Sequence, residues 1–451
     1  MRILAAEWVL PISSPPIKTG AVAIEDDKIV AVGEAGEISK KFPSLDKSDR
    51  DDLGPVAILP GLVNCHSHLE LTVMRGLLDN VENDFLSWLL KLNGIRAGLS
   101  PEDIEASALL GAIEGARAGV TCFGDVGRNG AAGLRALKQI GLRGVVFQET
   151  DFSPEDDKAE EYFLALKNKY LLLKEQADPL IEIGLSPHAP YTVCAGLFKK
   201  ITEFALQENI KTTIHSAESA IEDNFMLRGE GVLADMWKKG GFAWQPPGVS
   251  TTKYLSSLGV LGSKPLLVHC VNVDGDDLDL ITQSGSPVAH CPKSNAKFGH
   301  GIAPLDKFLQ KGIAVGLGSD SVASNNACDL IEEARFAALM ARTVKDKKTF
   351  TGAEEMLRMM TLGGAGALGL ENSIGSLEPG KQADLCVISI ESAAQMPVHN
   401  IAAAIVFSSG SRDVMLTMVA GKEIYRDGDI INVYESVLKA DIAELAEKMN
   451  S

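Results

Sequence analysis

Two histidines stand one residue apart in the stretch Leu59–Leu71, LPGLVNCHSHLEL, at the end of an apolar run. Because side chains at i and i+2 of an extended segment point to the same side, the rings of His66 and His68 can face one site together. Two imidazoles arranged in this way suit a borderline-soft divalent cation such as zinc. A lone H-x-H motif also occurs by chance on loops, so its meaning depends on whether the chain offers further ligands.

Further candidate ligands do occur later in the chain. His215 in IHSAES can supply a third nitrogen, and Asp320 in GLGSDS can supply an oxygen. Three histidines and one carboxylate leave a position for water or a substrate oxygen, as catalytic zinc sites require. Alone, Asp320 in a Gly-Ser-Asp-Ser segment would more often be a turn residue or a helix cap. We therefore predict one zinc ion bound by His66, His68, His215 and Asp320.

Two further residues are candidates for proton transfer. Glu218 follows His215 by three residues, which is close enough to exchange protons with bound water and with a leaving group. His269 in LVHCVNV could hydrogen-bond that water or polarise the electrophile. The alternatives are a first-turn helix acid for Glu218 and a hydrogen-bonded core histidine for His269. His188 stands where a carbamylated lysine would bridge two metals, which favours a single ion, although Glu149 leaves a second metal site open.

The elements that must position these residues are strands. Eight short apolar runs between about residues 57 and 321 end in polar residues: AILPGLVNCHSH, GVTCFGDV, GVVFQET, IEIGLSPHA, KTTIHSAES, PLLVHCVNV, SPVAHCPKSN and AVGLGSDS. The spacers are mostly long enough for helices, and one of them begins with Ser100 as N-cap and Pro101 at the first helical position. This alternation predicts an α/β fold with a (β/α)8 TIM barrel, whose chemistry lies at the carboxyl ends of the strands. The alternative is a doubly wound sheet, but no G-x-G-x-x-G follows the first strand.

The two ends of the chain have a different pattern. KTGAVAIEDDKIVAVG near the start, and KQADLCVIS and DVMLTMVAGKEIYRDG near the end, alternate apolar and polar residues around DD, GK and DG turns. We predict that residues 1–57 and 372–451 form one small composite β-sandwich domain, and that residues 58–371 form the barrel.

Composition narrows the class of protein. The 451 residues are 45% hydrophobic, which is enough for a sizeable core. The 60 acidic residues exceed the 43 Lys and Arg, and a formal charge of −17 disfavours nucleic acid or an anionic membrane as partner. Seven cysteines without a close C-x-x-C pair indicate neither a disulfide framework nor a zinc ribbon, and no apolar run approaches membrane-spanning length. We expect a cytoplasmic protein that acts on a small molecule and assembles as a homodimer or higher homo-oligomer.

Taken together, the motifs resemble a known family. PGLVNCHSH, SPHAPYTV, IHSAES, VHC, AHCPKSNAKFGHGIAPL, GLGSDS and GSLEPGKQADLCVI are similar, in order and over nearly the whole chain, to the deaminase and chlorohydrolase branch of the amidohydrolase superfamily. The resemblance implies one catalytic zinc, with iron or manganese as alternatives, and hydrolytic removal of an amine or halide from an aromatic heterocycle. By this resemblance, Glu218 is the proton shuttle and His269 aligns the hydroxide. Asp320 accepts a proton from metal-bound water, and His188 contacts the substrate.

The substrate pocket resembles two groups within that branch. HSHLELT followed by FLSWLLKLNGIRAGLS is similar to the aminodeoxyfutalosine deaminases, while Trp88 also matches the methylthioadenosine/S-adenosylhomocysteine deaminases. The resemblance places Glu70 and Trp88 in the substrate pocket and offers Arg96 or Arg143 to a substrate carboxylate, the alternative for either arginine being a solvated surface role. The helix after Trp88 lacks an acid that would bind a ribose diol, which argues against S-adenosylhomocysteine.

The predicted function is therefore metal-dependent hydrolytic deamination of a heterocycle of the 6-aminopurine nucleoside type. A hydrolase of chlorinated or N-alkylated heterocycles is the alternative, since it would use the same metal ligands. A catalytically inactive scaffold is the third hypothesis, which a complete set of ligands disfavours.

Overall fold

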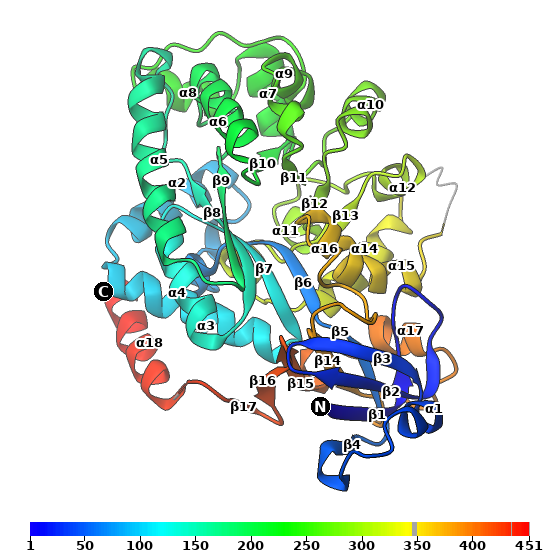
Figure 1. Cartoon of the computed structure of the whole chain (residues 1–451). Coiled ribbons are helices and arrows are strands. Elements are labelled where there is room, and N and C mark those ends of the chain that lie inside the picture. Colours follow the sequence, from blue (N-terminus) through cyan, green and yellow to red (C-terminus); the bar gives the residue numbers. More distant parts are fainter. Residues whose placement is uncertain (345–349, 434, 451) are drawn as a thin grey trace.

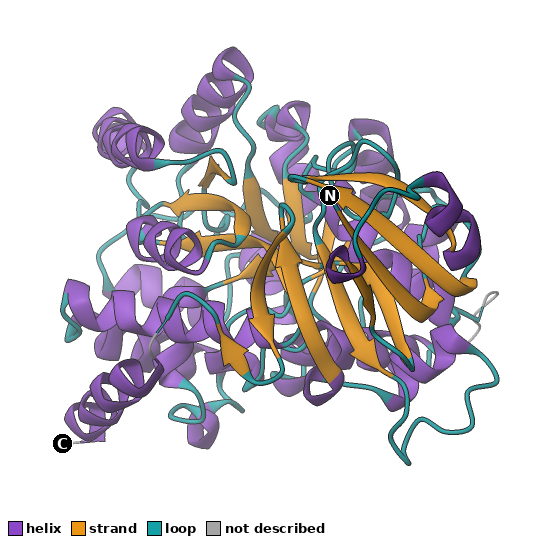
Figure 2. Cartoon of the chain, turned by 60° about the horizontal axis from the view of Figure 1, so that its bottom comes forward, coloured by secondary structure: helices purple, strands orange, loops and turns teal. Residues whose placement is uncertain are grey.

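Strands from both ends of the chain form one nine-stranded sheet in the computed structural model, which describes residues 1–344, 350–433 and 435–450. The strands are β1 (Arg2–Val9), β2 (Ile17–Glu25), β3 (Lys28–Glu34), β4 (Arg50–Asp52), β5 (Val56–Pro60), β14 (Leu385–Ser389), β15 (Val414–Val419), β16 (Lys422–Arg426) and β17 (Asp429–Ile430). Their order is β17-β16-β15-β14-β5-β1-β2-β3, with β4 beside β1. The two ends meet where β5 pairs antiparallel with β14, Pro60 lying opposite Leu385. The predicted composite unit is thus confirmed, and its long strands run side by side in Figure 2.

The eight predicted apolar runs form eight parallel strands. These are β6 (Leu62–Ser67), β7 (Val120–Gly127), β8 (Arg143–Glu149), β9 (Ile181–Ser186), β10 (Thr213–Ser216), β11 (Leu266–His269), β12 (Val288–His290) and β13 (Val315–Leu317). Hydrogen bonds divide them into two four-stranded sheets, β6-β7-β8-β9 and β10-β11-β12-β13. Among the described residues, the sheets are connected by isolated bridges, between Ser67 and Asp320 and between Leu185 and Thr212. The α/β alternation is therefore confirmed, whereas one continuous barrel ladder is not formed by the hydrogen bonds.

Helices surround these strands (Figure 1). They are α1 (Ala35–Lys41), α2 (Phe85–Ala97), α3 (Pro101–Arg117), α4 (Gly130–Ile140), α5 (Ala159–Gln176), α6 (Ala195–Glu208), α7 (Ala220–Arg228), α8 (Val232–Lys239), α9 (Thr251–Ser257), α10 (Gly275–Ser284), α11 (Pro292–Lys297), α12 (Leu305–Gln310), α13 (Val322–Asn325), α14 (Leu330–Ala341), α15 (Ala353–Arg358), α16 (Gly364–Ala367), α17 (Ile401–Ala403) and α18 (Glu435–Asn450). Helix α3 begins as predicted, because Ser100 and Asp103 cap each other's backbone N–H groups. Within the described ranges, no helix is both long and apolar enough to cross a membrane.

Both parallel sheets pack on the same core. One cluster of buried residues includes Val63, Val126 and Phe147 from the first sheet and Val268 and Ala289 from the second. Burying an aliphatic or aromatic side chain of this size contributes about 1.5–3 kcal/mol, so this shared core holds the two sheets against each other. The polar residues that follow β6, β10, β11 and β13 consequently converge on one place.

Candidate metal and active site

His66, His68 and Asp320 form the centre of the site. His66 lies in β6, His68 directly follows that strand, and Asp320 lies just beyond β13. The Nε2 atoms of His66 and His68 are 3.4 and 3.5 Å from the same carboxylate oxygen of Asp320. Potential ligand atoms of the three residues all lie within 4.8 Å of one another. This is the spacing of groups that converge on one cation.

His215, at the carboxyl end of β10, joins this group. Its ring centroid lies 5.0 Å from that of His66 and 5.5 Å from that of His68. The Nδ1 atoms of His68 and His215 lie 2.9 and 3.1 Å from the carbonyl oxygens of Val126 and His188. Because those carbonyls only accept, both Nδ1 atoms carry the proton and both Nε2 atoms are left as electron-pair donors. The structure therefore brings the four predicted ligands together.

The ring of His66 fits a metal particularly well. It is completely buried, yet neither ring nitrogen has a hydrogen-bond partner among the described residues. Burial lowers the pKa of His66 to about 3, so that its imidazole is neutral at physiological pH. A buried neutral imidazole with unpaired nitrogens is unfavourable by itself and becomes satisfied when a nitrogen binds a cation.

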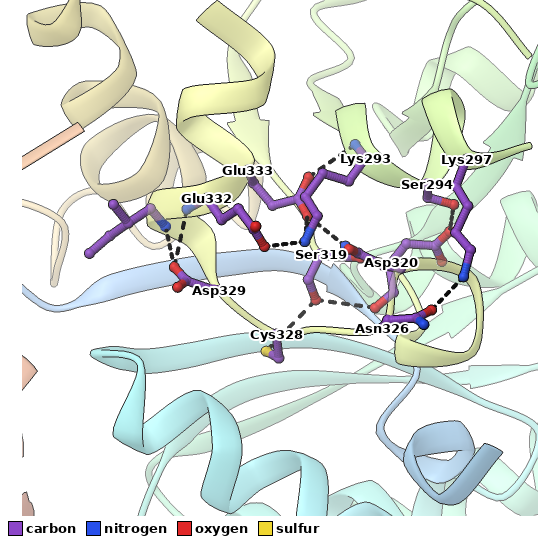
Figure 3. Close-up of polar contacts among 12 residues, drawn as sticks. Lys293, Ser294, Lys297, Ser319, Asp320, Asn326, Cys328, Asp329, Glu332 and Glu333 are labelled. Carbon is purple, nitrogen blue, oxygen red and sulfur yellow. Dashed lines mark hydrogen bonds and ion pairs between the residues drawn. The ribbon is translucent and has the colours of Figure 1, made fainter. Parts of the chain in front are cut away.

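Two serine hydroxyls hold the carboxylate of Asp320 in place. Its Oδ2 accepts a hydrogen bond from Ser294 at 2.6 Å, which Figure 3 draws, and another from Ser324 at 3.0 Å. Its Oδ1 is the oxygen that faces His66 and His68. Burial alone would raise the pKa of Asp320, but the histidines around its carboxylate, His66 first among them, outweigh burial and hold the pKa well below its usual range. The backbone of Asp320 is left-handed, with φ of 56°, and its N–H donates to the His66 carbonyl. Such strain persists only where the surrounding contacts determine the position of a residue.

A buried polar network supports the segment that carries Asp320. Glu333 of α14 accepts hydrogen bonds from the side chain of Asn325 and from the backbone of Lys293, near which Figure 3 draws it. The Asn325 amide also donates to the carbonyl of Ser319, and Ser319 is bound on its other side by Asn64 of β6. Because Asn64 stands two residues before His66, this network ties the strand of the histidines to the segment of the aspartate.

Glu218 lies beside the candidate metal centre, facing two histidines. Its Oε1 is 3.6 Å from Nε2 of His269 and 3.5 Å from Nε2 of His300. Burial alone would raise the pKa of Glu218, but the neighbouring His269 and His300 outweigh burial and lower the pKa to about 2. Nδ1 of His269 is held by the Asn295 side-chain oxygen at 2.9 Å. The buried carboxylate of Glu222 accepts the backbone N–H of Glu218 and thereby fixes the position of this acid.

Two adjoining cavities open beside these groups. The inner cavity is lined by His68, His215, Glu218, His269 and Asp320 and by the aromatic rings of Phe85, Trp88 and Phe298. An outer cavity of about 550 Å³, here called the vestibule, shares Leu89, Asn93, Arg96, Arg128 and His188 with it. The rings of Trp88 and Phe298 are 4.8 Å apart in an edge-to-face arrangement. Aromatic rings and polar groups thus line the same inner cavity, whose volume is about 70 Å³.

The predicted substrate contacts differ in where they lie. Trp88 lines the inner cavity, and His188 lines both cavities. Glu70 lines the vestibule, where it accepts a hydrogen bond from Arg96 at 3.0 Å. Arg143 lies at the amino end of β8 and forms a buried ion pair with Asp384 at 2.8 Å. It is not among the described residues that line either cavity, so the structure does not bring Arg143 to the site.

Glu149, the residue that left a second metal site open, also has possible partners. Ligand atoms of Glu149, His188 and His215 lie within 4.8 Å of one another. However, Nε of Arg128 lies 3.6 Å from the Glu149 carboxylate and already supplies positive charge there. His188 is bound through Nδ1 to Thr192, and His215 belongs to the first group of ligands. This second group is therefore a poorer cation site than the first.

Several residues of the site were missed from the sequence. His300, Asn295, Glu222 and Arg128 all lie outside the set of predicted residues, although Arg128 stands next to the carboxyl end of β7 just as the predicted ligands stand at or next to the carboxyl ends of their strands. The place of Arg128 at the end of a predicted strand was the one local sign in the sequence that this residue belongs to the site. His300 falls in a loop beyond α11, where nothing in the local sequence relates it to Glu218.

Comparison with known proteins agrees with this geometry. The sequence pattern described as "Amidohydrolase family" matches residues 57–424, and that of an imidazolonepropionase-like composite domain of bacteria matches residues 20–44. A 5-methylthioadenosine/S-adenosylhomocysteine deaminase from Thermodesulfovibrio yellowstonii is 31% identical over 437 residues, which cover 94% of this chain and 93% of that protein.

Two solved structures are similar over nearly the whole chain. The crystal structure of an adenosine deaminase from Xanthomonas campestris with bound zinc superposes with a TM-score of 0.85 at 27% identity, covering 99% of this chain and 98% of the other. Aminofutalosine deaminase from Helicobacter pylori superposes with a TM-score of 0.79 over 94% of this chain and 100% of the other, and at 21% identity it is evidence for the fold alone. With a family pattern that spans most of its length and a relative of this identity, the chain belongs to the amidohydrolase family.

Proposed function

We propose that the protein is a zinc-dependent deaminase that hydrolyses the exocyclic amine of a 6-aminopurine nucleoside. The observation that carries this proposal is the convergence of His66, His68 and Asp320, with His215 beside them, on one point next to the ionised carboxylate of Glu218. Support for the substrate class comes from the names of the relatives, which act on adenosine-like compounds. Zinc in the solved adenosine deaminase supports the choice of metal.

The donor set also favours zinc on chemical grounds. Three imidazole nitrogens and one carboxylate oxygen suit zinc, with iron and manganese as alternatives, and leave room for one more ligand. When bound in such a site, zinc lowers the pKa of the water it holds to about 7, which supplies a nucleophile at neutral pH. His66, His68, His215 and Asp320 would hold the ion.

The remaining steps belong to the side chains. Glu218 is ionised at neutral pH, so it can accept a proton from the attacking water and pass it to a ring nitrogen of the base. His269, whose Nδ1 is bound to Asn295, presents Nε2 toward the reacting atoms and orients the attacking oxygen. Oδ1 of Asp320 accepts the second proton of that water and passes it to the leaving amine. The overall reaction adds one water and releases one ammonia. One water proton ends on the ring nitrogen and the other on the leaving amine.

Trp88 and Phe298 are proposed to hold the base. Both rings line the inner cavity together with Glu218, which supports a pose in which a flat heterocycle stacks on them and brings its amine-bearing carbon near that carboxylate. His188, which lines both cavities, is proposed to contact the substrate where the base joins the sugar.

The test separates metal binding from chemistry. His66→Ala is expected to lose metal and activity together, whereas Glu218→Gln is expected to keep the metal and lose turnover by about 10²- to 10⁴-fold, since it removes the proton acceptor. His399→Ala, at an exposed histidine outside the site, is the matched control and should keep both. Metal content by mass spectrometry and ammonia release from adenosine-like nucleosides are the measurements. Full turnover in Glu218→Gln would remove this residue from the mechanism.

The alternative, a hydrolase of chlorinated or N-alkylated heterocycles, is tested in the same assay. Chloride release from chlorotriazines should be undetectable beside ammonia release from aminated purines. The reverse result would replace the deaminase by the chlorohydrolase.

We further propose that the two four-stranded sheets are halves of one (β/α)8 barrel over residues 58–371, flanked by a β-sandwich domain of residues 1–57 and 372–451. The bridges at Ser67 and Leu185 and the core shared by both sheets support this arrangement.

A further inference from the structure

His300 contacts the proposed proton shuttle from outside the two cavities. Its Nε2 is 3.5 Å from Oε1 of Glu218, which is ion-pair distance. That nitrogen is buried and forms no other hydrogen bond within the described part of the chain. His300 is not among the described residues that line the inner cavity or the vestibule. The ring is therefore placed to act on the reaction through Glu218 and not by touching the substrate.

The ring of His300 is held by its neighbours. Its centroid lies 5.1 Å from that of Phe85 in an edge-to-face arrangement, and 5.2 Å from that of Phe298, to which it is inclined by only 28°. On either side of His300, Gly299 and Gly301 have φ of 66° and 114°, backbone angles that residues with a side chain rarely adopt. The loop thus turns sharply at this residue, and the aromatic contacts fix the orientation of its ring.

Two histidines face Glu218, but they differ in what they can donate. Nδ1 of His269 lies 2.9 Å from the side-chain oxygen of Asn295, so in the neutral ring the proton is on Nδ1 and Nε2 is an acceptor. No such bond holds Nδ1 of His300 in the described ranges, and its neutral ring can carry the proton on Nε2. The carboxylate of Glu218 is ionised and only accepts, which favours the proton on that nitrogen.

The two oxygens of Glu218 are consequently unequal. His269 and His300 both make their contact with Oε1, at 3.6 and 3.5 Å. An N–H directed at a carboxylate oxygen stabilises the negative charge there and makes that oxygen a weaker proton acceptor than the other one. A proton that Glu218 takes up is therefore expected on Oε2.

We propose that His300 is a positioning residue, which directs its Nε2–H at Oε1 of Glu218 and reserves Oε2 for the transferred proton. An O–H bond of the attacking water breaks as an O–H bond to Oε2 forms, and this second bond breaks when the ring nitrogen of the base takes the proton. Glu218 returns to its ionised form, and His300 keeps its own proton throughout. The proposal rests on the proposed function, to which it adds a residue that holds the shuttle in its reactive orientation.

The first experiment separates the N–H donor of His300 from the bulk of its ring. His300→Leu fills a similar space without a donor, whereas His300→Gln keeps a side-chain N–H that can reach Oε1. The substrate is whichever of adenosine, 5′-deoxyadenosine and methylthioadenosine the wild type deaminates fastest, and ammonia release is measured.

His300→Leu is expected to lower kcat about 10- to 100-fold with unchanged metal content, as loss of a residue that orients a reacting group typically does. KM should change less than about threefold, and His300→Gln should lose less than about threefold in kcat. His399→Leu, at an exposed histidine outside the site, is the matched control and should equal wild type. Equal losses in His300→Leu and His300→Gln, or a smaller loss in His300→Leu, would show that the ring acts by packing alone and would overturn the proposal.

A second experiment locates the proton without turnover. In metal-loaded protein with nitrogen-15-labelled histidine, the ring signals of His300 are identified in magnetic resonance spectra by their absence from His300→Gln. Their chemical shifts should place a proton on Nε2, and Glu218→Gln should shift them while the signals of His399 stay unchanged. A proton on Nδ1 alone, or His300 signals that do not respond to Glu218→Gln, would refute the contact.

The two readouts distinguish this proposal from the deaminase function. If no nucleoside releases ammonia while the Nε2 proton of His300 responds to Glu218→Gln, the proposed function fails and the contact stands. If wild type deaminates and His300→Leu does so equally well, the function stands and the positioning role is refuted. If neither turnover nor a response is found, both proposals fail.

Discussion

At the scale of single residues, the orientation of one ring decides what His269 can do. Asn295 holds Nδ1 of His269, which leaves Nε2 facing Glu218 at 3.6 Å. Residues that orient an active-site histidine typically contribute about 10- to 100-fold to activity or metal affinity. Asn295→Ala is therefore expected to lower kcat by about that factor while metal content stays the same.

The control for this prediction is Asn80→Ala. Asn80 is exposed, lies outside the site and accepts a hydrogen bond from Lys91, so its loss should leave kcat unchanged. A wild-type kcat in Asn295→Ala, with the metal retained, would show that Asn295 does not orient the ring.

The residues that could be found from the sequence were those at the ends of strands. His66, His215 and Asp320 stand there, and the carboxyl ends of parallel strands meet, so their convergence could be anticipated. Arg143 stands at the opposite end of β8 and could have been set aside by the same rule. His300 could not have been found in this way, because its contact with Glu218 depends on how a loop folds back over the site.

At the scale of elements, the metal centre depends on how closely β13 and its extension approach β6. A Cβ atom on Gly318 would lie 2.8 Å from Cβ of His66 and 3.0 Å from the His66 carbonyl oxygen. Gly318→Ala must therefore displace Asp320 or His66, and ligand geometry is sensitive to shifts of a few tenths of an ångström. We expect the dissociation constant for zinc to rise at least about tenfold, as titration against a chelator would measure.

The matched substitution for this test is Gly366→Ala in α16. A Cβ there would meet nothing within 4 Å, so zinc affinity should be unchanged and helix stability slightly improved. An unchanged zinc affinity in Gly318→Ala would mean that the close approach of β13 and β6 is not needed for binding.

The positions of the strands could be predicted from the sequence better than the way in which the strands pair. Each apolar run indicated a strand because local hydrophobic patterning is legible in the sequence. The division of the strands into two sheets could not be predicted from the sequence. Strands β12 and β13 have three residues each, and the bridges between the sheets involve single residue pairs. The partner of β5 was equally hidden, because nothing near Val56–Pro60 specifies strand β14.

At the scale of the whole molecule, His290 is expected to make the fold sensitive to acid. It ends β12, and burial followed by the charge of His269 lowers its pKa from 6.5 to about 4. Between these two pH values the unfolded chain binds a proton that the folded chain does not, so stability falls as the pH decreases from about 6.5 toward 4. One such group accounts for about 2 kcal/mol between pH 7.5 and pH 5.

The measurement compares wild type with His290→Asn. Urea unfolding at pH 7.5 and pH 5 should show that the variant loses about 2 kcal/mol less stability than wild type over this interval. His399→Ala, which removes an exposed histidine, should follow wild type. Identical pH dependence in wild type and His290→Asn would exclude His290 as a source of acid sensitivity.

The pairing of β5 with β14 has a consequence for biosynthesis. Pro60 and Cys386, which contact each other across these two strands, are 326 residues apart. At a translation rate of about 5–20 residues per second, β14 is synthesised tens of seconds after β5, and the edge of β5 stays unpaired on the ribosome for that time. Throughout that interval an apolar strand edge is open to aggregation, so the nascent polypeptide should require chaperone protection until its last segments emerge.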